Sequence, residues 1–496
     1  TLRGVNSSTT SGVVLFSTTT GTNGNDNNLI EFSDITDGAG TPANGIFASG
    51  STGTIAQWND NNTISNCNIF NYFLASGSWG INLSAGNQGW TMSNNSFYQT
   101  VSRAPTSNFG GIQCSSSTGT GNFTISGNFI GGTLPACGGT ALTLTGSGVF
   151  LGMNIVTTSL TTTTISGNTV ANVNQTTTNT GTAYTGITVT TGSFNINNNI
   201  IGSATVAGNI TISYGSTTQN TFTAINSNAA TPNQINIGGN TISGIMFLTT
   251  STAGMSLRGI WLQSTANYNV TNNIIGGTLA NSLTNNGGSN SVIGMLVGGT
   301  NTTITGNTVS NLSNTGTVST SAVVNGINGG PTGIYNLSNN TISKLSNAAP
   351  STGTSSSAAV NGLIVGGSGT LGNTIAQNTI SELSSTATTG AVNINGIVLT
   401  STSTTGANII ERNFIHSFSA TSTGTVVMNG FNGTGVSNFT IRNNMIRLGV
   451  DASGNAVTGD YLINGITEVV GTHNYYHNSV YIGGTGVVGT LNNTFA

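Results

Sequence analysis

The chain has 496 residues, and only 17 of them carry a formal charge, seven basic and ten acidic. This is far below the quarter of residues that is typical of soluble domains. Contact with nucleic acid needs clustered Lys and Arg, and Lys344 is the only lysine, so the composition excludes a nucleic-acid partner. No apolar run approaches the roughly 20 residues of a membrane-spanning helix, so we predict no membrane insertion.

A short phrase recurs from one end of the chain to the other: an aliphatic residue, two small or polar residues, Asn, one residue, and another aliphatic. Its strongest copies are 125–130, 165–170, 237–242, 304–309, 375–380 and 441–446. Looser copies centre on Asn28, Asn62, Asn95, Asn199, Asn273, Asn340, Asn413 and Asn478. Successive Asn residues are about 31 to 41 positions apart, a period that predicts a solenoid.

Each repeat begins with a Gly followed by an apolar residue, as in Gly259-Ile260, and then alternates like a β-strand. The other copies of this pair begin at Gly45, Gly80, Gly111, Gly148, Gly186, Gly294, Gly326, Gly362, Gly396, Gly430 and Gly465. A second strand ends at the aliphatic residue three before the Asn, and a third strand begins just after the Asn. Asn-Gly pairs before strand one, at 325, 361, 395, 429 and 464, predict a further turn.

The recurring Asn is expected at the corner between strands two and three, because Asn tolerates left-handed backbone angles. When coils stack, equivalent Asn side chains can bond to each other in a ladder. The predicted corner residues are Asn62, Asn95, Asn128, Asn168, Asn199, Asn240, Asn273, Asn307, Asn340, Asn378, Asn413, Asn444 and Asn478. The sequence therefore predicts an all-β, right-handed parallel β-helix of about 14 coils. We expect one continuous domain over 1–496, from a longer or processed repeat protein.

The N-terminal coils hold an acidic cluster of Asp26, Glu31, Asp34, Asp37 and Asp60. The first four can supply calcium ligands. Edge charges also discourage unwanted pairing of strands, and this simpler interpretation leads us to predict no cofactor.

The three cysteines are expected to have structural roles. Cys114 falls in an inward slot of strand one, beside positions such as Leu83 and Leu151. Cys67 lies five residues after Asn62, in a slot that holds Val173 and Leu312 elsewhere, so both cysteines are predicted to be buried small hydrophobes. Cys137 lies in a loop, and whether it pairs with Cys114 is left open.

The outward positions of strand one form an apolar stripe in the middle of the chain, at Trp261, Leu296, Ile364 and Val398. Exposed apolar patches usually mark interfaces, so this stripe is a candidate lateral contact with another protein. The alternative is that an insertion loop covers it. The insertion at 348–358 has no large apolar residue and is expected to lie in solvent.

The three histidines, His416, His473 and His477, lie near the C-terminal end. A spacing of four between the last two need not bring them together on a strand, and no cysteine is near. A zinc site is therefore not predicted, and polar or stacking roles are expected.

The Gly-Ile and Ile-x-x-Asn-x-Ile phrases resemble the right-handed parallel β-helix repeats of the pectin-lyase-like superfamily. The Thr, Asn and Gly-rich composition, including Tyr475-Tyr-His-Asn-Ser-Val-Tyr-Ile-Gly-Gly484, resembles large secreted surface repeat proteins of Bacteroidota. The resemblance covers nearly the whole chain. It implies an extracellular or cell-surface location, but the fold is shared by enzymes, adhesins and fibres.

The motifs of enzymes with this fold are missing. Members resembling polygalacturonases have Asp pairs, Gly-His-Gly and Arg-x-Lys, and none of these occurs here. Members resembling pectate lyases need several acidic calcium ligands, yet 67–381 contains no Asp or Glu. Because glycoside hydrolysis ordinarily requires paired carboxylates, we predict that the chain is not an enzyme.

The first hypothesis is a non-enzymatic extracellular structural protein, a β-helical subunit of a fibre, filament or sheath that assembles by contacts between copies. The alternative is an adhesin or carbohydrate-binding module that binds extracellular glycans through loops and aromatic residues, with Trp79, Trp90 and Trp261 as candidates. A polysaccharide lyase or hydrolase is the third hypothesis. A mixed, acid-bearing groove on one sheet would favour that third hypothesis.

Overall fold

The computed structural model describes residues 1–115, 121–158, 161–215, 220–230, 233–249, 255–287, 290–317, 320–368, 372–405, 408–459, 461–484 and 494–495. Contacts divide the chain into two compact units. Unit 1 comprises 1–216 and 220–245, and unit 2 comprises 217–219 and 246–496. Each unit is a right-handed parallel β-solenoid, and the two make about 13 turns in total. The prediction of fold class is confirmed.

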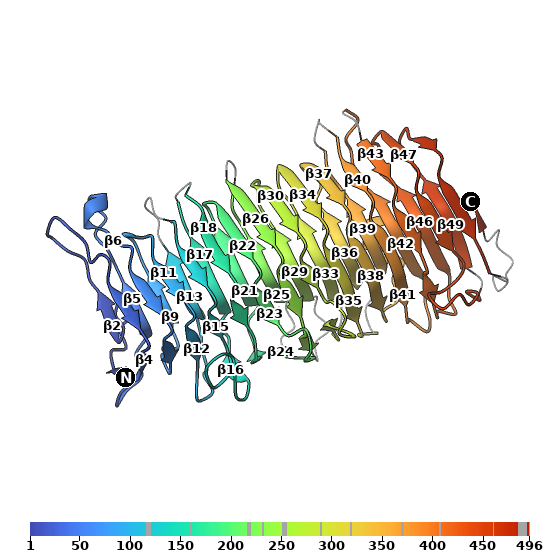
Figure 1. Cartoon of the computed structure of the whole chain (residues 1–496). Coiled ribbons are helices and arrows are strands. Elements are labelled where there is room, and N and C mark those ends of the chain that lie inside the picture. The colour runs from blue at the N-terminus through green and yellow to red at the C-terminus, as the bar shows by residue number, and fades with distance from the viewer. Residues whose placement is uncertain are drawn as a thin grey trace. The chain divides into compact units, whose positions relative to one another are not determined.

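Each coil gives one strand to each of two parallel sheets and one or two strands to the third, so strands far apart in sequence lie side by side (Figure 1). Within a coil, the first strand belongs to sheet 1 and the second strand belongs to sheet 2. The strand or strands that follow the Asn corner belong to sheet 3.

In unit 1, sheet 1 consists of β2 (Val14–Phe16), β5 (Asn44–Ala48), β9 (Ser78–Leu83), β13 (Phe109–Ser115), β17 (Phe150–Val156), β21 (Thr182–Thr190) and β25 (Asn220–Ser227). Sheet 2 consists of β3 (Leu29–Glu31), β7 (Thr63–Ser65), β11 (Thr91–Ser93), β14 (Thr124–Ser126), β18 (Thr163–Ser166), β22 (Phe194–Asn197) and β26 (Gln234–Gly238). Sheet 3 consists of β1 (Leu2–Gly4), β4 (Asp34–Asp37), β8 (Asn68–Phe70), β12 (Ser96–Tyr98), β15 (Phe129–Ile130), β16 (Leu142–Gly146), β19 (Thr169–Val170), β20 (Val173–Thr177), β23 (Ile200–Gly202), β24 (Ile210–Tyr214) and β27 (Thr241–Ser243). A short pair, β6 (Asn59–Asp60) and β10 (Asn87–Gln88), and a 3-10 turn, η1 (Ile55–Gln57), complete the unit. The boundary between the units falls within β28 (Ile245–Thr249).

In unit 2, sheet 1 consists of β29 (Met255–Leu262), β33 (Asn290–Val297), β36 (Val323–Gly329), β39 (Val360–Val365), β42 (Val392–Leu399), β46 (Val426–Gly433), β49 (Tyr461–Glu468) and β52 (Thr494–Phe495). Sheet 2 consists of β30 (Asn267–Thr271), β34 (Asn301–Thr305), β37 (Ile334–Ser338), β40 (Thr374–Ala376), β43 (Asn408–Glu411), β47 (Phe439–Arg442) and β50 (Asn474–Tyr476). Sheet 3 consists of β31 (Ile274–Ile275), β32 (Leu283–Asn285), β35 (Thr308–Asn314), β38 (Thr341–Asn347), β41 (Thr379–Ser385), β44 (Phe414–His416), β45 (Ser419–Ala420), β48 (Met445–Leu448) and β51 (Ser479–Ile482). A second 3-10 turn is η2 (Ser355–Ser357).

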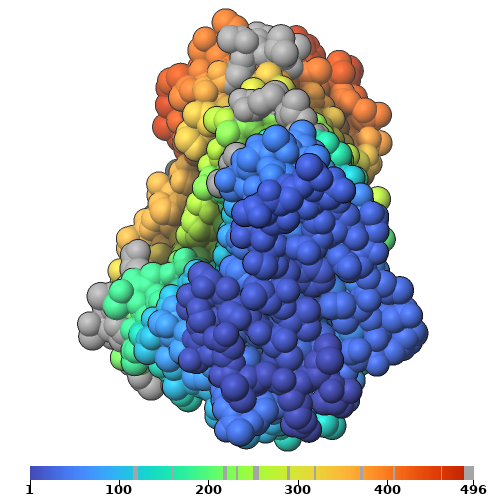
Figure 2. Space-filling view, turned by 90° about the vertical axis from the view of Figure 1, so that its left-hand side faces the viewer, coloured from blue at the N-terminus to red at the C-terminus, as the bar shows by residue number. Residues whose placement is uncertain are grey.

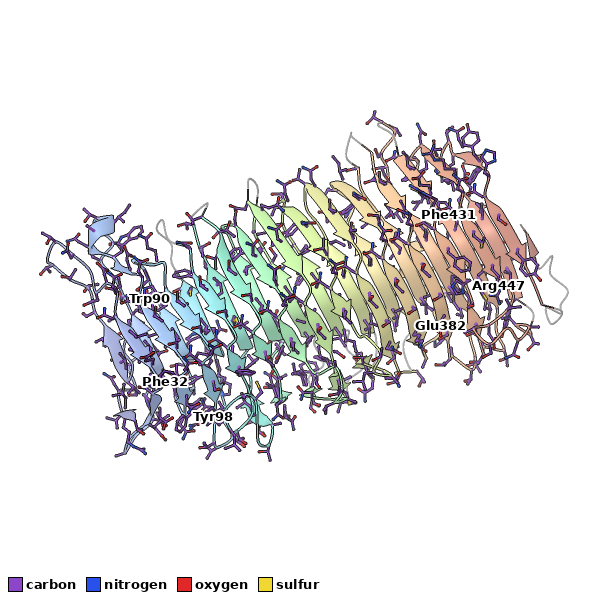
Figure 3. All side chains as sticks on the ribbon, in the orientation of Figure 1. Phe32, Trp90, Tyr98, Glu382, Phe431 and Arg447 are labelled. Carbon is purple, nitrogen blue, oxygen red and sulfur yellow. The ribbon has the colours of Figure 1, made fainter. Side chains whose placement is uncertain are left out.

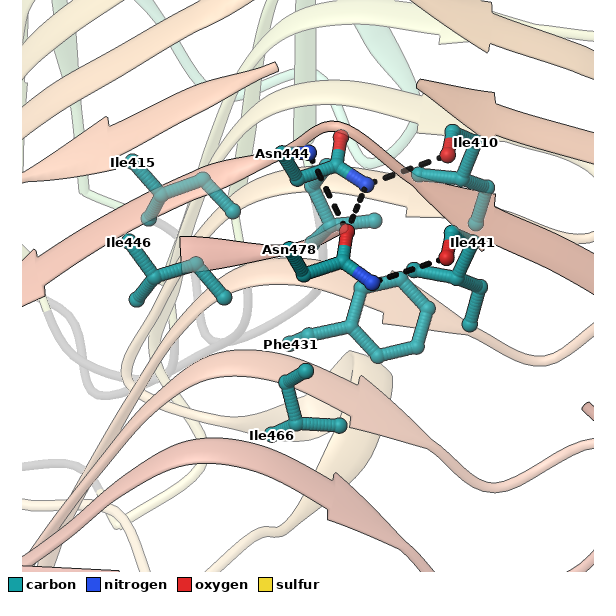
Figure 4. A pocket seen from close by; sticks show the side chains of 9 residues that line it. Ile410, Ile415, Phe431, Ile441, Asn444, Ile446, Ile466 and Asn478 are labelled. Atoms are coloured by element: carbon teal, nitrogen blue, oxygen red, sulfur yellow. Dashed lines mark hydrogen bonds between the residues drawn. The ribbon is translucent and has the colours of Figure 1, made fainter. Parts of the chain in front are cut away.

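The predicted Asn corner forms a buried ladder between sheets 2 and 3. The Nδ2 group of each Asn donates to the Oδ1 atom of the Asn one coil later, over 2.9 to 3.0 Å. It also donates to the carbonyl of an apolar residue in the preceding coil, as Asn444 does to Ile410 (Figure 4). The ladder runs through Asn95, Asn128, Asn168, Asn199 and Asn240 in unit 1, and through Asn273, Asn307, Asn340, Asn378, Asn413, Asn444 and Asn478 in unit 2.

The left-handed backbone angle at this corner belongs to the residue before the ladder Asn, which corrects the expected reason for the Asn. Gly127, Gln377 and Arg412, for example, have φ of 64°, 59° and 56°. The ladder position itself selects Asn because a buried amide there satisfies groups in two neighbouring coils at once.

Asn62 is not part of this ladder, contrary to the prediction. It lies before β7, where its Oδ1 atom accepts from the Nδ2 group of Asn28 at 2.8 Å. The corner between β7 and β8 is Cys67, whose backbone N–H donates to Oδ1 of Asn95 at 3.0 Å. The predicted slot of Cys67 is therefore also wrong, although its side chain is buried as expected.

The inward Gly of strand one is confirmed in most coils and misplaced in one. The register places Ile112 beside Met153, so the equivalent glycine is Gly152 and not Gly148. Ile155, and not Leu151, is therefore the neighbour of Cys114. A side chain at this position would enter the core: a Cβ atom on Gly362 would lie 2.5 Å from the side chain of Ile380.

A second Asn ladder lies within sheet 1 of unit 2, at the Asn-Gly pairs that we had expected to form turns. Nδ2 of Asn361 donates to Oδ1 of Asn325 at 3.0 Å, and the same bond links the pairs that follow. The later rungs are Asn395 to Asn361, Asn429 to Asn395 and Asn464 to Asn429, at 2.9, 2.8 and 2.8 Å. The Asn of each Asn-Gly pair therefore lies within a strand and not in a turn, because its side-chain amide bonds to the Asn of a neighbouring coil.

The insertion at 348–358, here called the strap, folds back on sheet 1 instead of extending into solvent. Asn393 and Asn395 donate their side-chain N–H groups to the carbonyls of Gly353 and Ser355, over 2.8 and 3.2 Å. Oγ of Ser355 reaches Oγ1 of Thr434 at 2.9 Å. The strap thus crosses the outer face of β42 and binds it through main-chain carbonyls.

Candidate functional site

A groove on sheet 3 of unit 2, which we call the serine groove, is lined by three charged side chains, Lys344, Glu382 and Asp451. Its volume is about 350 Å³. One wall is a row of aligned serines, Ser346, Ser384 and Ser419. The parallel row consists of Asn311, Lys344, Glu382 and Ser417, one residue from each successive coil. Ala280, Asn281 and the turn at 451–453 complete the lining.

The row that holds Lys344 and Glu382 has a left-handed backbone. The φ angles of Asn311, Lys344, Glu382 and Ser417 are 57°, 56°, 55° and 62°. Unit 1 has Asn172 at the equivalent position, four residues after a ladder Asn. This conformation is uncommon for Lys and Glu, and such positions cluster at functional sites.

The groove contains hydroxyl groups, one ammonium and two carboxylates. Asp451 is held by its own turn, where the backbone N–H groups of Ser453 and Asn455 donate to Oδ1 at 2.9 and 2.8 Å. The side chain of Asn455 donates to its other oxygen, and these bonds lower the pKa of Asp451. The site therefore offers a fixed anion, opposite hydroxyls that can donate or accept.

His416 and Arg447 are neighbours on the sheet beside the groove, and Figure 3 labels Arg447 and Glu382 on this sheet. Burial lowers the pKa of His416, and Arg447 lowers it further, whereas Glu382 raises it. The ring of His416 stacks on Phe414 with centroids 4.2 Å apart. On the same sheet in the next coils, Met445 pairs with Phe414 and Tyr481 pairs with Arg447, and these two side chains are 53% and 59% exposed.

No family model, curated protein or solved structure matches the chain. The site is therefore interpreted from its own geometry. Among the described residues, no helix is long and apolar enough to cross a membrane.

The predicted interface stripe is one aligned row, as expected, but only part of it is accessible. Trp261 and Leu296 are neighbours and both are partly exposed. Ile364 and Val398 are 2% and 0% exposed, because the strap binds to either side of their row. These two residues are thus excluded as interface residues. The guanidinium of Arg258 lies 3.9 Å from the ring centroid of Trp261, a cation–π contact.

Two of the three tryptophans considered for glycan binding are internal. Trp79 is 4% exposed, and Trp90 is fully buried with its indole N–H donated to the carbonyl of Asn59 at 2.7 Å. Neither ring can serve as a surface platform. Trp261 alone of the three is partly exposed.

The acidic residues of the first coils bond to neighbouring coils. Asp26 accepts the backbone N–H of Asp60 at 2.8 Å, and Asp34 accepts the amide of Asn68 at 2.9 Å. Asp37 accepts the amide of Asn71 at 3.3 Å, while Glu31 lies on β3. Within the described residues no group of three or more potential ligands is gathered for a metal ion.

The three cysteines are free in the structure. Cys114 is fully buried beside Leu83, as predicted, and burial raises the pKa of its thiol. Cys137 lies in a loop with a left-handed φ of 57°. A buried thiol with a raised pKa is a poor nucleophile, so Cys114 serves as packing.

His473 and His477 are not brought together as a metal site. Nδ1 of His473 lies 3.2 Å from a Glu468 oxygen, and its ring packs edge-on against Phe439 and Tyr475. His477 has a φ of 53° and precedes the ladder residue Asn478. The stacking and polar roles predicted for His416 and His473 are confirmed.

Sequence reasoning missed the serine groove, although a signal was present. Lys344 and Glu382 each lie four residues after a ladder Asn, and Ser346 and Ser384 lie six after it. Aligning the repeats on Asn340 and Asn378 would have placed these four side chains in two adjacent rows.

Proposed function

We propose that the chain is a non-enzymatic, extracellular structural protein, a β-solenoid subunit of a surface fibre, filament or sheath assembled by contacts between copies. The observation that carries this proposal is the use of buried amides. Two Asn ladders, one at the inner corner and one on the outer face of sheet 1, bond coil to coil in unit 2, so these amides serve stacking. Asn ladders of this kind contribute to the kinetic and thermodynamic stability of stacked β-structures.

The proposal includes kinship with the right-handed β-helices of the pectin-lyase-like superfamily and with secreted repeat proteins of Bacteroidota. The recurring Ile-x-x-Asn-x-Ile phrase and the scarcity of charge support it. We propose the cell surface or its surroundings as the location, since hydroxyl and amide groups hydrate the coils in place of charge.

Lateral contact between copies is proposed at Trp261 and Leu296, where two apolar side chains lie side by side on sheet 1 and are partly exposed. A second accessible apolar area lies on the first coil of unit 1, whose end faces the viewer in Figure 2. Phe32 there is 76% exposed, and Leu29 is 58% exposed. Exposed apolar side chains in neighbouring positions are typical of contact surfaces.

Electron microscopy of the purified protein at micromolar concentration tests assembly. We expect filaments or sheets from the unmodified protein, and dispersed particles when Trp261→Ser and Leu296→Ser are combined. The matched control combines Val101→Ser and Val206→Ser, which remove two exposed apolar side chains of unit 1. Circular dichroism should show unchanged β-structure in both variants. Dispersed particles from the unmodified protein would contradict the structural proposal.

The second candidate function is an adhesive or carbohydrate-binding module, and the serine groove is the observation that favours it. Hydroxyls, carboxylates and an ammonium group beside partly exposed rings are the groups that bind a polyhydroxylated ligand. A groove that bears acids is also the feature that would favour a polysaccharide-degrading enzyme, so release of reducing or unsaturated sugar ends should be assayed in parallel.

A glycan-binding screen tests this second candidate. Tyr481→Ala should weaken binding about tenfold if the ring stacks on a sugar. Tyr476→Ala removes an equally exposed ring from sheet 2 and should leave binding unchanged. Equal losses from both substitutions would count against the groove as the binding site.

A further inference from the structure

The strap shows what the outer face of sheet 1 binds. In the coils that the strap covers, the side-chain amide of each ladder Asn donates one N–H to the Asn of the preceding coil and the other N–H to a strap carbonyl. Asn395 donates one to Asn361 at 2.9 Å and another to the carbonyl of Ser355 at 3.2 Å. Asn361 donates to Asn325 at 3.0 Å and to the carbonyl of Ser356 at 3.3 Å. The face is thus an array of amide donors for main-chain carbonyls, here supplied by the 3-10 turn η2.

The same array continues into the next two coils. The register aligns Asn395 with Asn429 and Asn464, on β46 and β49. Asn429 and Asn464 each donate to the preceding ladder residue at 2.8 Å, as Asn361 and Asn395 do. The hydroxyl of Ser355 reaches Thr434 beside β46, but the strap carbonyls that accept side-chain amides bond to β39 and β42. In the described part of the chain no main-chain carbonyl accepts from the side chains of Asn429 and Asn464.

A groove of about 290 Å³, here called the amide groove, lies over this uncovered part of the array. Thr354 and Ser355 of the strap form one of its walls. The floor includes Asn429, Asn432 and Asn464, and Val427, Leu462 and Val469 add apolar contact at the sides. None of the described residues that line the groove carries a formal charge.

We propose that the amide groove is a docking site for an uncharged peptide segment rich in Ser, Thr and Gly, supplied by a partner chain. The segment continues the surface already occupied by the strap and binds in the same way. Its main-chain carbonyls accept from the second N–H groups of Asn429 and Asn464, and its small side chains pack against Val427 and Leu462. A charged segment is disfavoured because no lining group compensates a buried charge. This inference is independent of the assembly proposed above.

A synthetic peptide with the strap sequence 351–358, acetylated and amidated, is the probe. Calorimetry or chemical-shift titration of the full chain should show saturable binding with a Kd of about 0.1–1 mM, because the contact is small and polar. A peptide with Glu at the positions of Ser355 and Ser357 should bind at least about tenfold more weakly.

Variants of the chain locate the site. Thr467→Arg fills the groove from β49, and Asn464→Ala removes the last described donor while only one rung of the ladder is lost. Both should weaken peptide binding about tenfold. Thr379→Arg places the same bulk and charge on the outer row of sheet 3 and should change nothing. Equal binding by Thr467→Arg and Thr379→Arg would overturn the proposal, as would the absence of binding at about 5 mM peptide. Preferential binding of a neutral oligosaccharide with no peptide binding would also overturn it.

Discussion

Replacing Asn340 by Leu is expected to lower the free energy of unfolding of unit 2 by about 3–5 kcal/mol. The leucine has a similar volume but leaves three buried groups without partners. These are the backbone N–H and one side-chain N–H of Asn307, which now donate to Oδ1 of Asn340 at 3.0 Å, and the carbonyl of Ile304. The other N–H of that amide keeps its bond to the carbonyl of Val270. Each buried polar group left unpaired costs about 1–3 kcal/mol.

Asn336→Leu is the matched control for Asn340→Leu. Asn336 lies in β37 of the same coil, but its side chain is exposed, so its replacement should change stability by less than about 0.5 kcal/mol. Hydrogen exchange is the preferred measurement, because coils of a solenoid contact only their neighbours and open locally. Equal protection of β37 and β38 in the two variants would show that the ladder does not stabilise the coils.

Replacing Tyr184 by Ala is expected to destabilise unit 1 by about 3–5 kcal/mol, the loss seen when a buried aromatic residue is truncated. Tyr184 is fully buried in a column of rings. Its centroid lies 4.8 Å from that of Phe150 and 4.7 Å from that of Phe222, with both pairs stacked. Removal of the central ring leaves a cavity between two aromatic faces.

Tyr184→Phe should not destabilise unit 1. The phenolic oxygen of Tyr184 is buried and has no hydrogen-bond partner among the described residues, and burial raises its pKa well above the usual value. Removing that hydroxyl keeps the stack and abolishes an unsatisfied group, so stability should be unchanged or higher by about 1 kcal/mol. Thermal melting followed by near-ultraviolet circular dichroism distinguishes the two substitutions. Destabilisation by Tyr184→Phe would show that the hydroxyl has a partner.

Much of the fold could be predicted because each coil repeats its own register. The aliphatic residue, the Asn and the next aliphatic residue are placed by the same contacts in every coil, so twelve of the thirteen predicted corner residues lie on the ladder. The failure at Asn62 has a physical cause. Only 28 residues separate Cys67 from Asn95, and the phrase around Asn62 belongs to a different corner that links it to Asn28. The local sequence pattern around an Asn does not distinguish the corner before sheet 2 from the corner between sheets 2 and 3, because both have a left-handed residue before the Asn.

The serine groove could not be recognised from single residues. Lys344 and Glu382 are ordinary charged residues in the sequence, and only the left-handed turn four residues after each ladder Asn points them along one row. A covering loop is one of the two alternatives for the apolar stripe, but the sequence predicts the insertion at 348–358 to lie in solvent and does not identify it as that loop. Its lack of apolar side chains suggested solvent, but it binds sheet 1 through main-chain carbonyls, which every sequence supplies.

The two ladders of unit 2 have opposite polarity. At the corner, the amide of Asn340 donates to Asn378, toward the C-terminal side, whereas in sheet 1 the amide of Asn395 donates to Asn361, toward the N-terminal side. The dipoles of the two amide columns therefore largely cancel along the coil axis. When two coils stack in the same direction, an amide donor of one faces an amide acceptor of the other at the corner. The same match occurs on sheet 1, with donor and acceptor exchanged between the two coils. A coil in the reversed direction would bring like groups together in both columns, so the pair of ladders works as a check on direction as well as a source of stability.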